Sequence, residues 1–390
     1  MFASEQRAAS DGAALKVLHV FQFFYPDFTG EGIYFQRLAP FLESEGIRND
    51  VAVTVTEGSK RDERSTISEY FRHLNVRYFG NKEKDSNIFR FLIWLLFNVR
   101  RFEVVHVHAH PDRFFLTALI ARLMGCRVIY SCTLEDSPAG LLTRYRRSYR
   151  PIVRLLMRTI HQFIAISPKL YTEGLSVVPV QRMVMVPQGV VIPTSSHLHR
   201  REWRQRYGFE GDEIILLWVG GICERKDVLF LIDNFAVLLG ADPRLRFLIV
   251  GPRHLEPDYA AAVGERVRHL GLDSAVIFQD FLDDPGPVYD LADMFVFASR
   301  SEGFGNVLLE AMARGLPVVS RRIPGVTNYF IHDGENGFLF DKAEQYRAIV
   351  HRLASDGDLR ARIGSAGKTF VEANLQMDVI ARRYLDIYTS

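Results

Sequence analysis

Two glutamates, Glu302 and Glu310, flank a glycine-bearing turn in the segment SRSEGFGNVLLEAMAR. Gly303 and Gly305 remove side-chain bulk, so the backbone of this turn can approach a ligand closely. From about Asn306 the sequence predicts a helix, whose free N–H groups and dipole favour an anion such as phosphate. Carboxylates accept hydrogen bonds from hydroxyls, so the pattern suggests a nucleotide sugar with ribose at one glutamate and the transferred sugar at the other. The plain alternative is two solvated charges near a helix start.

Short apolar runs on either side of the turn predict strands. Residues 294–298 (MFVFA) are β formers without a polar residue, which is typical of a strand buried on both faces of a parallel sheet. The expected helix is stopped by Gly315, and residues 317–320 (PVVS) predict the next strand. The turn therefore lies between a strand and a helix of a parallel α/β unit.

The start of the chain repeats this arrangement. Residues 16–21 predict a strand, Gly30 and Gly32 punctuate the loop after it, and residues 33–44 show helical periodicity that ends at Gly46. On its own a Gly-x-Gly turn is a weak signal, since any Rossmann-like unit needs a tight first turn.

The stretch SRSEGFGNVLLEAMARGLPVVS resembles the E-x7-E signature of retaining glycosyltransferases built from two Rossmann-type domains, in particular family 4. The resemblance implies that Glu302 contacts the donor sugar, that Glu310 holds the ribose, and that turn amides receive the diphosphate. The donor-binding residues it implies in this stretch are Glu302, Gly303, Phe304, Gly305, Asn306, Val307 and Glu310.

The resemblance extends to the strand predicted over 213–220, which leads into GICERKDV. The family places an Arg after the first glycine of this turn, here Gly220, and a Lys five residues later, both on the diphosphate. Lys226 matches the lysine, whereas Gly221 stands where the arginine is expected. Arg225 could restore that charge.

Two further donor contacts are implied by the resemblance. The loop after the strand at 276–279, which includes Phe281, resembles the place where the base is held, largely by backbone. The family's first loop carries a glycine pair that faces the diphosphate and the acceptor. Here that pair is Gly30 and Gly32, with Glu31 between them.

Candidate catalytic residues also follow two strands of the first half. In the strand at 104–108 two histidines share one face, and His108 lies nearer the carboxyl end, where ligands bind in open parallel sheets. His108 either faces the site or is structural. Many family members have a His where this chain has Thr133. Glu135 or Asp136 could instead face the acceptor hydroxyl, or cap the following helix.

Residues 141–163 form the most basic stretch of the chain. The sequence predicts a positive stripe along one helical face, with Pro151 at a first turn or a kink and with apolar cover from Ile152, Leu155, Leu156 and Ile160. The arginines of the stripe are Arg147, Arg150, Arg154 and Arg158. They form either a solvated face or a surface for anionic lipid headgroups, where each adds about 1 kcal/mol.

Composition excludes several classes of protein. A chain of 390 residues that is 48% hydrophobic and 24% charged has room for two cores, and its net charge of +2 argues against a nucleic-acid binder. Residues 1–195 hold 25 Lys and Arg against 18 Asp and Glu, while residues 196–390 hold 23 against 28, so the first half carries the basic surface. No metal site is predicted. Three buried free thiols are expected at Cys126, Cys132 and Cys223.

Targeting signals are not evident. The first fourteen residues lack an apolar core typical of a signal peptide, so they are expected to be a frayed tail. The longest apolar run, 89–99, is too short to span a bilayer. We expect a cytoplasmic protein, either free or peripheral on the inner face of the plasma membrane.

Together these patterns predict an α/β protein with two Rossmann-like domains facing across a cleft, the GT-B fold. The domains are expected over 1–192, on the acceptor side, and 193–374, on the nucleotide-sugar side, with a helix at 375–390 that crosses back. The predicted reaction moves a sugar from a nucleoside diphosphate to an acceptor hydroxyl, with retention and without a cofactor or metal. The acceptor is expected to be a lipid-linked sugar or a growing polysaccharide.

Two alternatives stay open at this point. Gly221 and Thr133 depart from the family pattern, which would suit a catalytically silent nucleotide-sugar binder or scaffold. A nicotinamide-dependent oxidoreductase would share the Rossmann units, but no strand here is followed by a complete G-x-G-x-x-G.

Overall fold

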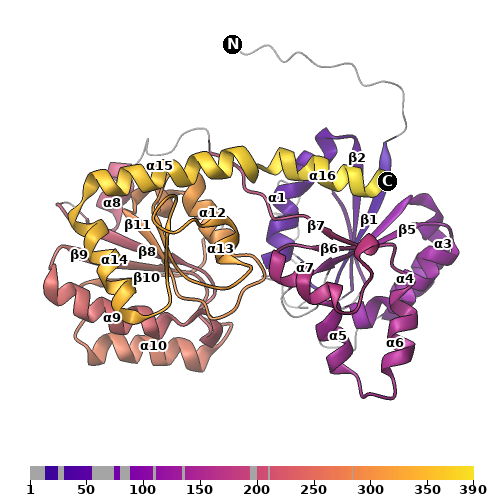
Figure 1. Cartoon of the computed structure of the whole chain (residues 1–390), viewed down its shortest axis with the longest axis horizontal. Helices are drawn as coiled ribbons and strands as arrows, with labels where there is room; N and C mark the ends of the chain where they lie inside the picture. The colour runs from indigo at the N-terminus through magenta and orange to yellow at the C-terminus, as the bar shows by residue number, and fades with distance from the viewer. Residues whose placement is uncertain are drawn as a thin grey trace, which may run out of the picture. The chain divides into compact units, whose positions relative to one another are not determined.

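The structure is a computed structural model, and its contacts divide the chain into two compact units (Figure 1). Unit 1 is Met1–Ala165, Glu173–Val184 and Ala381–Ser390, and unit 2 is Ile166–Thr172 and Met185–Ile380. The described residues are 14–24, 30–54, 74–79, 88–108, 111–133, 137–193, 200–209, 211–282 and 284–390, with only the backbone described for 111–114. The expected amino-terminal tail, Glu135 and Asp136 lie outside the described residues.

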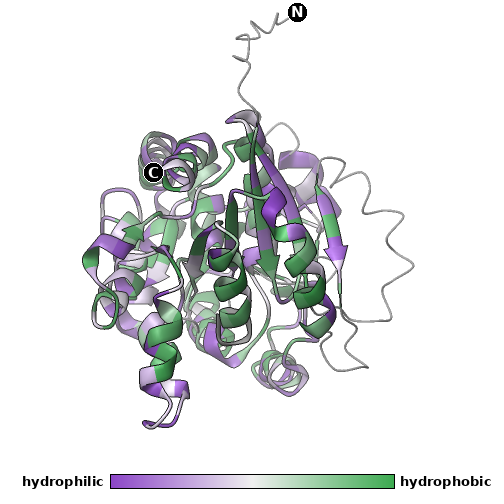
Figure 2. Cartoon of the chain, turned by 90° about the vertical axis from the view of Figure 1, so that its right-hand side faces the viewer, coloured by the Kyte–Doolittle hydropathy of each residue, from purple (hydrophilic) through white to green (hydrophobic). Residues whose placement is uncertain are grey.

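Unit 1 is built on a seven-stranded sheet in the order β3-β2-β1-β4-β5-β6-β7. Its strands are β1 (Leu15–Phe21), β2 (Ile47–Val53), β3 (Asn75–Tyr78), β4 (Val104–His108), β5 (Arg127–Cys132), β6 (Gln162–Ala165) and β7 (Met183–Met185). Strands β1 to β6 pair in parallel, and the register places His19 opposite His106. Hydrophobic residues colour this sheet and the helix faces against it, with hydrophilic residues toward the outside (Figure 2).

Helices cover this sheet and connect its strands. They are α1 (Gly30–Ser44), α3 (Ile88–Asn98), the 3-10 helix η2 (Val99–Arg101), α4 (Pro111–Leu123), α5 (Pro138–Arg144), α6 (Arg150–Met157) and η3 (Val180–Arg182). Two more helices have residues in both units: α7 (Pro168–Leu175), which belongs to unit 2 as far as Thr172, and α16 (Met377–Thr389), which belongs to unit 1 from Ala381. The expectation that Gly30 and Gly32 lie in a loop is wrong, because α1 begins at Gly30. Glu31 in the first turn suits the positive end of the helix dipole.

The basic stretch at 141–163 is not one helix. Two helices, α5 and α6, are separated by a turn that contains Arg147, so the prediction of four arginines on one helical face is wrong at Arg147. Pro151 lies in the first turn of α6, where its missing N–H has no intrahelical partner to lose. Arg150 and Arg154 belong to α6, and Arg158 is its C-cap residue.

Unit 2 contains a six-stranded parallel sheet in the order β10-β9-β8-β11-β12-β13. Its strands are β8 (Ile214–Val219), β9 (Leu245–Val250), β10 (Val276–Gln279), β11 (Met294–Phe297), β12 (Val318–Arg321) and β13 (Phe338–Phe340). The other elements are α8 (Arg200–Arg206), η4 (Glu224–Lys226), α9 (Val228–Ala241), α10 (Pro257–His269), α11 (Gly286–Leu291), α12 (Asn306–Ala313), α13 (Thr327–Phe330), α14 (Ala343–Ser355) and α15 (Gly357–Asn374).

The predicted strands and their parallel pairing are confirmed in both units. β8 and β11 read as uninterrupted apolar runs because helices cover both faces of the sheet, and Trp218, Phe235 and Phe247 are fully buried in its core. The fold is therefore the expected α/β arrangement of two Rossmann-like sheets.

Each sheet has a switch point where its strand order reverses. In unit 1 it lies between β1 and β4, and in unit 2 between β8 and β11. Ligands of open parallel sheets bind outside the carboxyl ends of the strands at such points, so the side chains there are the first candidates for a site.

Two smaller expectations concern the thiols and the membrane. Cys126 and Cys132 are buried as expected, but Cys223 is only half-buried because it precedes the surface turn η4. Among the described residues no helix is long and apolar enough to cross a bilayer.

Candidate functional site

Charged side chains from two loops meet at the switch point of unit 2. β8 leads into η4 and its neighbour β11 leads into the loop before α12, so the two loops lie side by side. Lys226 Nζ lies 2.6 Å from Glu302 Oε1, and Arg225 Nη1 lies 2.8 Å from the same oxygen. Ser299 Oγ also donates a hydrogen bond to that oxygen at 2.6 Å. Three donors thus converge on one carboxylate oxygen.

Glu302 is charged although it is only 7% exposed. Burial by itself raises the pKa of Glu302, but Lys226, Arg225 and the hydrogen bonds from Lys226 and Ser299 together hold that pKa below its ordinary value. Two cations against one carboxylate leave a surplus positive charge. Such a surplus suits a ligand that carries phosphate.

Asp227 links the turn that carries Lys226 to Arg300 and Arg321 at the same edge of the sheet. Among the described residues it is the one non-glycine residue with a positive φ, 53°, a conformation that stores about 1–3 kcal/mol of strain. Its carboxylate accepts hydrogen bonds from Arg300 at 2.9 and 3.1 Å and from Arg321 at 2.8 Å. The backbone N–H of Arg300 donates to the carbonyl of Arg225 at 2.9 Å. The turn that carries Lys226 is therefore held against the loop that carries Glu302.

The amino end of α12 is open toward the same edge. Gly305 has φ 102°, and a Cβ there would meet Leu308 at 3.3 Å, so only glycine allows this turn without strain. Phe304 is 2% exposed and packs against the ring of Phe330, with ring centroids 5.4 Å apart. Asn306 Oδ1 is buried without a partner among the described residues. The backbone amides of the turn and of the first residues of α12 lie where the sequence predicts an anion site.

Glu310 and Phe281 lie around this turn. Glu310, on α12, accepts a hydrogen bond from the hydroxyl of the buried Tyr289 at 3.0 Å, and this bond orients its carboxylate. Phe281 follows β10 and is 45% exposed. The two glutamates thus have different partners, since Glu302 is paired with cations and Glu310 with a phenol.

Gly221 and Gly251 stand where close packing leaves no room for a Cβ atom. A Cβ on Gly221 would collide with the side chain of Leu255, and a Cβ on Gly251 would collide with the carbonyl of Gly220. An arginine at position 221 would therefore displace Leu255. Arg225 instead brings a guanidinium to Glu302 and also donates to the carbonyl of Ser301 at 2.6 Å.

The switch point of unit 1 holds a hydrogen-bonded set that we call the histidine chain: Asn49, His19, His108 and Glu31. His19 Nε2 lies 2.9 Å from Asn49 Oδ1, and His19 Nδ1 lies 3.0 Å from His108 Nε2. His108 Nδ1 lies 3.0 Å from Glu31 Oε1 at the start of α1. The first three members are buried. Both ring nitrogens of His108 are therefore engaged within unit 1.

His106 packs beside the histidine chain. Its Nδ1 lies 2.7 Å from the Tyr388 hydroxyl and its Nε2 lies 2.8 Å from Ser131 Oγ. Burial lowers the pKa of His19 and of His106 well below the ordinary value, with further lowering by His108, and burial lowers the pKa of His108 to about 3. One nitrogen from each of the three rings lies within 4.8 Å of the others. Their ring nitrogens already have hydrogen-bond partners, so a metal is not needed to explain the cluster.

The chain is similar to known proteins in sequence and in structure. Residues 28–192 match the family described as "Glycosyltransferase Family 4", and residues 199–370 match "Glycosyl transferases group 1". The chain belongs to glycosyltransferase family 4. The expectation drawn from the segment around Glu302 is thereby confirmed at the level of the family.

Three relatives illustrate the range of this family. The lipopolysaccharide core biosynthesis glycosyltransferase of Rhizobium meliloti is 29% identical over 48% of this chain, and the match spans 53% of that relative, about half its length. The alpha-D-kanosaminyltransferase of Streptomyces kanamyceticus is 27% identical over 76% of this chain and 81% of its own length. The crystal structure of the Anabaena protein HepE with UDP and glucose has a TM-score of 0.78 at 18% identity, covering 96% of this chain and 99% of that protein.

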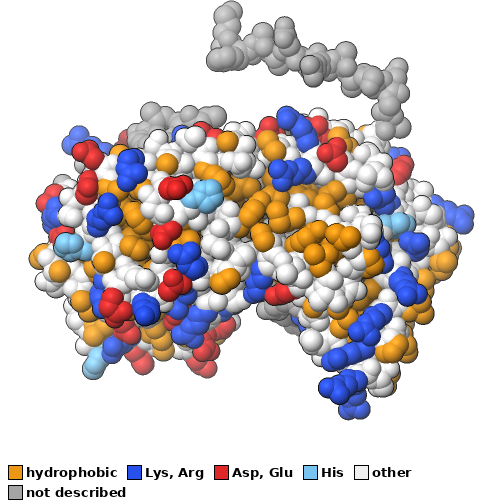
Figure 3. Space-filling view, in the orientation of Figure 1, with side chains coloured by type: hydrophobic (Ala, Val, Ile, Leu, Met, Phe, Trp, Pro, Cys, Tyr) orange, Lys and Arg blue, Asp and Glu red, His pale blue; other side chains and the backbone are white. Residues whose placement is uncertain are grey.

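The outer surface of this glycosyltransferase is both apolar and basic over the helices of unit 1. α3 packs against α4, and α4 packs against α6. Large exposed hydrophobic side chains of this region are Phe89, Ile93, Leu96 and Phe97 on α3, Leu116 and Leu123 on α4, and Tyr149, Ile152 and Leu155 around α6. Figure 3 shows Lys and Arg side chains gathered with hydrophobic ones at the lower end of unit 1, over α5 and α6.

The expected apolar cover by Ile152 and Leu155 is wrong. These side chains are 56% and 61% exposed, whereas Val153, Met157 and Ile160 are buried. The buried residues, at spacings of three and four, set which face of α6 turns inward, so Ile152 and Leu155 must point outward.

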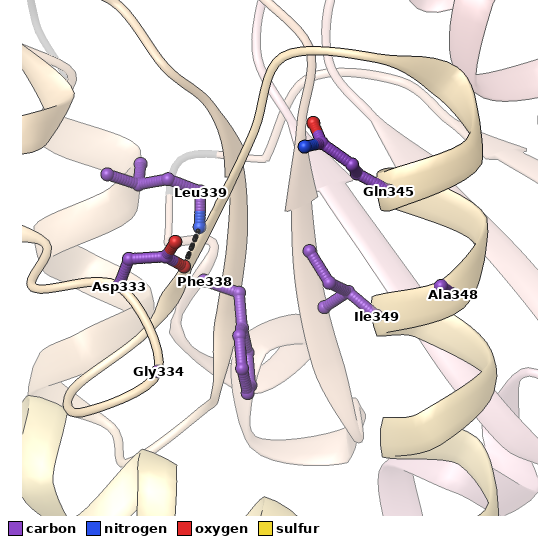
Figure 4. Close-up of a pocket in the computed structure, with 7 residues that line it drawn as sticks. All are labelled: Asp333, Gly334, Phe338, Leu339, Gln345, Ala348 and Ile349. Carbon is purple, nitrogen blue, oxygen red and sulfur yellow. Dashed lines mark hydrogen bonds between the residues drawn. The ribbon is translucent and has the colours of Figure 1, made fainter.

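A pocket in unit 2 is lined by none of the charged residues that meet at Glu302 (Figure 4). It is an open depression between β13 and α14, lined by apolar side chains and by Asp333, Gly334 and Gln345. Asp333 Oδ1 accepts a hydrogen bond from the Leu339 amide at 2.9 Å. The lining contains no cationic side chain, so this depression does not suit a diphosphate.

Sequence reasoning found Lys226, Glu302 and Glu310 but missed several partners. Ser299 and Arg300 stand inside the quoted SRSEGFG segment, and their positions two and three residues before Glu302 were a usable signal. Asp227 follows Lys226 directly, although nothing local shows that it binds Arg300. For the histidine chain the sequence held only the alternating histidines of β4.

Proposed function

We propose that this glycosyltransferase moves a sugar from a nucleoside diphosphate to an acceptor hydroxyl with retention of the anomeric configuration. The observation that carries this is the meeting of Lys226 and Arg225 with buried Glu302 at the switch point of unit 2. A carboxylate for sugar hydroxyls and cations for phosphate are the two chemistries that such a donor requires.

Different residues are proposed to bind different parts of the donor. Glu302 contacts the transferred sugar, Glu310 holds the ribose, and Phe281 lies beside the base. The diphosphate is received by Lys226, by Arg225 and by backbone amides of residues 303–307, with Gly30, Gly32, Gly220 and Gly221 giving close backbone approach. The hydrogen bond from Tyr289 to Glu310 supports a fixed orientation for the ribose acceptor.

Catalysis rests on charge stabilisation of the leaving diphosphate. Neutralising the developing charge by fixed donors contributes about 10²- to 10³-fold for each donor. No side chain is assigned as a covalent nucleophile, in contrast to the paired carboxylates of retaining hydrolases. The surplus positive charge around Glu302 supports a reaction that needs no metal or cofactor. His108, through Glu31, and Asp136 are the proposed contributors from the first half of the chain.

The acceptor is proposed to be a lipid-linked sugar or a polysaccharide intermediate. One relative is a lipopolysaccharide core biosynthesis enzyme by name. The exposed apolar side chains of α3 and the arginines Arg147, Arg150, Arg154 and Arg158 support docking of unit 1 on an anionic membrane surface at the inner face of the plasma membrane. A nucleic-acid partner is not proposed.

A mass-spectrometric screen tests the function directly. The full chain is incubated with nucleoside diphosphate sugars of different base and sugar, together with lipid-linked sugar acceptors, and both the glycosylated product and the released nucleoside diphosphate are measured. Product formation by the wild type and its loss in Lys226→Met would support the proposal. Tight donor binding without turnover across the screen would instead favour a catalytically silent binder.

A further inference from the structure

A group of nitrogen donors lies at the amino ends of β6 and β7 in unit 1, on the edge of the sheet opposite the switch point. Arg122 is in the last turn of α4, His161 directly precedes β6, and Arg182 ends η3 just before β7. Arg182 donates hydrogen bonds to the carbonyl oxygens of Met157 and Ile160, so its guanidinium lies beside the start of β6. We call Arg122, His161 and Arg182 the amino-edge cluster.

His161 is a neutral ring that carries its proton on Nε2. The backbone N–H of Val128 donates to His161 Nδ1 at 2.9 Å, so Nδ1 keeps its lone pair. A neutral imidazole has one N–H group, which is then on Nε2. Burial, followed by the charges of Arg122, Arg127 and Arg182, lowers the pKa of His161, in agreement with a neutral ring.

Two donors of the amino-edge cluster therefore face each other without an acceptor. Arg122 Nη1 lies 2.9 Å from His161 Nε2, and a guanidinium has no lone pair to offer. Two N–H groups cannot bond to each other, but both can donate to one anionic oxygen that they share. The Arg122 side chain is exposed and His161 is half-buried, so such an oxygen can approach from solvent.

The positive charge of the amino-edge cluster is not compensated by a carboxylate side chain. Burial, followed by the charges of Arg122 and Arg158, lowers the pKa of Arg182. Within the described part of the chain, neither Arg122 nor Arg182 forms an ion pair. The nearby Arg127 donates to the main-chain oxygen and the hydroxyl of Ser390 and is therefore already engaged. The cluster thus favours an anion.

Exposed apolar side chains flank the amino-edge cluster. Leu123, next to Arg122, is 73% exposed, and Val180, at the start of η3, is 56% exposed. Ile152 and Leu155 are exposed on α6, which packs against α4. A site for free phosphate needs no apolar neighbours. The phosphate of a lipid headgroup lies just above acyl chains, which such side chains can contact.

We propose that the amino-edge cluster binds the phosphate of an anionic lipid headgroup. Arg122 Nη1 and the Nε2–H of His161 donate to one phosphate oxygen, and Arg182 adds positive charge beside it. This inference rests on the proposed docking of unit 1 on an anionic membrane. It goes further than that docking, because hydrogen bonds from two fixed donors recognise phosphate oxygens in addition to their charge.

Competition between two salts tests whether phosphate is recognised. The full chain is bound to vesicles of phosphatidylcholine and phosphatidylglycerol and is then released with sodium phosphate or with sodium chloride. Both salts screen charge equally at the same ionic strength, but only phosphate can occupy the cluster. Phosphate should therefore release the wild type at a several-fold lower ionic strength. Equal release by the two salts would overturn the proposal.

Two variants each remove one donor. Arg122→Gln removes the exposed guanidinium, and His161→Asn removes the Nε2 donor while its side-chain oxygen can still accept from Val128. Each should bind the vesicles about tenfold more weakly and should be released equally by both salts, because a hydrogen bond to a charged group is lost. Arg48→Gln, which removes an exposed arginine of β2, is the matched control and should behave as the wild type.

The variants also separate the cluster from the docking as a whole. Vesicle binding and salt response equal to the wild type in Arg122→Gln would overturn the cluster and leave the docking intact. Circular dichroism checks that each variant is folded. Because Arg122 is an exposed side chain, Arg122→Gln decides the outcome even if His161→Asn does not fold.

A measurement in solution separates a lipid from a soluble phosphate compound. Nitrogen NMR of isotopically labelled histidines, with the His161 signal assigned through His161→Asn, is followed as inorganic phosphate is added without vesicles. A shift of the Nε2 signal in a protein that also binds the vesicles would support the proposal, and no shift would overturn it. A shift in a protein that ignores acidic vesicles at low salt would overturn the lipid as occupant and count against the proposed docking. Sugar transfer in the mass-spectrometric screen is independent of these results.

Discussion

The two switch points of this glycosyltransferase share a strand arrangement and differ in charge. In unit 2, Glu302 is a buried carboxylate held by Lys226 and Arg225 at the ends of β8 and β11. In unit 1, the corresponding ends of β1 and β4 carry His108 and, through it, Glu31. One switch point has a surplus of positive charge, whereas the other is built around buried histidines whose pKa values are lowered by burial.

This difference teaches that one strand order can serve opposite electrostatic tasks. A buried carboxylate stays ionised only where cations compensate for its lost hydration, as Lys226 and Arg225 do for Glu302. Among the described residues, the hydrogen-bond partners of the rings in and beside the histidine chain include Asn49, Ser131, Tyr388 and Glu31, and none of these bonds joins a ring to a cation. The fold supplies the edge, and the side chains after each strand decide its charge.

The largest expected effect concerns the basic surface of unit 1. Replacing all four arginines of unit 1, at positions 147, 150, 154 and 158, with glutamine should abolish binding to vesicles with acidic lipid, since each adds about 1 kcal/mol. Donor affinity should stay unchanged because the donor residues of unit 2 are untouched. Vesicle sedimentation at rising salt is the measurement.

A salt series provides the control for this expectation. Attraction between exposed charges fades beyond about 8 Å at physiological ionic strength, so wild-type binding should fall as salt is raised. The double variant Phe89→Ser with Phe97→Ser should weaken the vesicle binding that remains at high salt. A wild-type protein that ignores acidic vesicles at low salt would show that this surface is an ordinary solvated face.

Loss of a cation at the charged switch point should nearly stop the reaction. Lys226→Met removes the closest partner of Glu302 and a proposed contact of the diphosphate, so kcat/KM should fall about 10³-fold. Lys368→Met, on the surface of α15, removes an equal charge and should change kcat/KM by less than about twofold. Steady-state kinetics with the identified donor measure this change. A decrease in kcat/KM of less than about tenfold in Lys226→Met would refute the assignment of Lys226 to the diphosphate.

The two glutamates should separate binding from turnover. Glu302→Gln should lower kcat about 10²-fold while sparing affinity for the bare nucleoside diphosphate, because this carboxylate is assigned to the sugar. Glu310→Ala should weaken that affinity about tenfold, since the ribose loses a charged acceptor. Calorimetry measures both, and equal losses of affinity would contradict the division.

Acid should destabilise unit 1 through its neutral histidines. The folded-state pKa values of His19 and His106 are depressed, so their contribution to stability is present above about pH 6.5 and is lost as pH falls below that value. By about pH 5 each costs about 2 kcal/mol, because the unfolded chain takes up a proton that the folded one refuses. Calorimetric unfolding measures this, and His106→Gln should remove about a third of the dependence, because His108 also has a lowered pKa.

Removal of divalent ions should have the smallest effect. Fixed amides and cations around Glu302 are proposed to replace a metal, so activity in EDTA should stay within about twofold of the untreated value. A full loss of activity that magnesium or manganese restores would show that the surplus charge of unit 2 is not sufficient.

Local pattern was enough to predict the strands, the turn at Gly303 and Gly305 and the helix after it. Apolar runs and glycine positions report backbone structure over a few residues, and that structure depends on those residues themselves. Lys226 and Glu302 were also found from the sequence, through a resemblance that covers the motif. Their contact across 76 residues is shown only by the structure.

Tertiary structure alone decided the partners that set each charge. The turn before Pro151 removed Arg147 from the predicted stripe, and the inward face of α6 left Ile152 and Leu155 exposed. The links of the histidine chain join residues 30 to 89 positions apart on β2, β1, β4 and α1. The direction of these hydrogen bonds depends on which atoms come into contact when separate strands pair. A local sequence pattern does not determine which distant side chains come into contact.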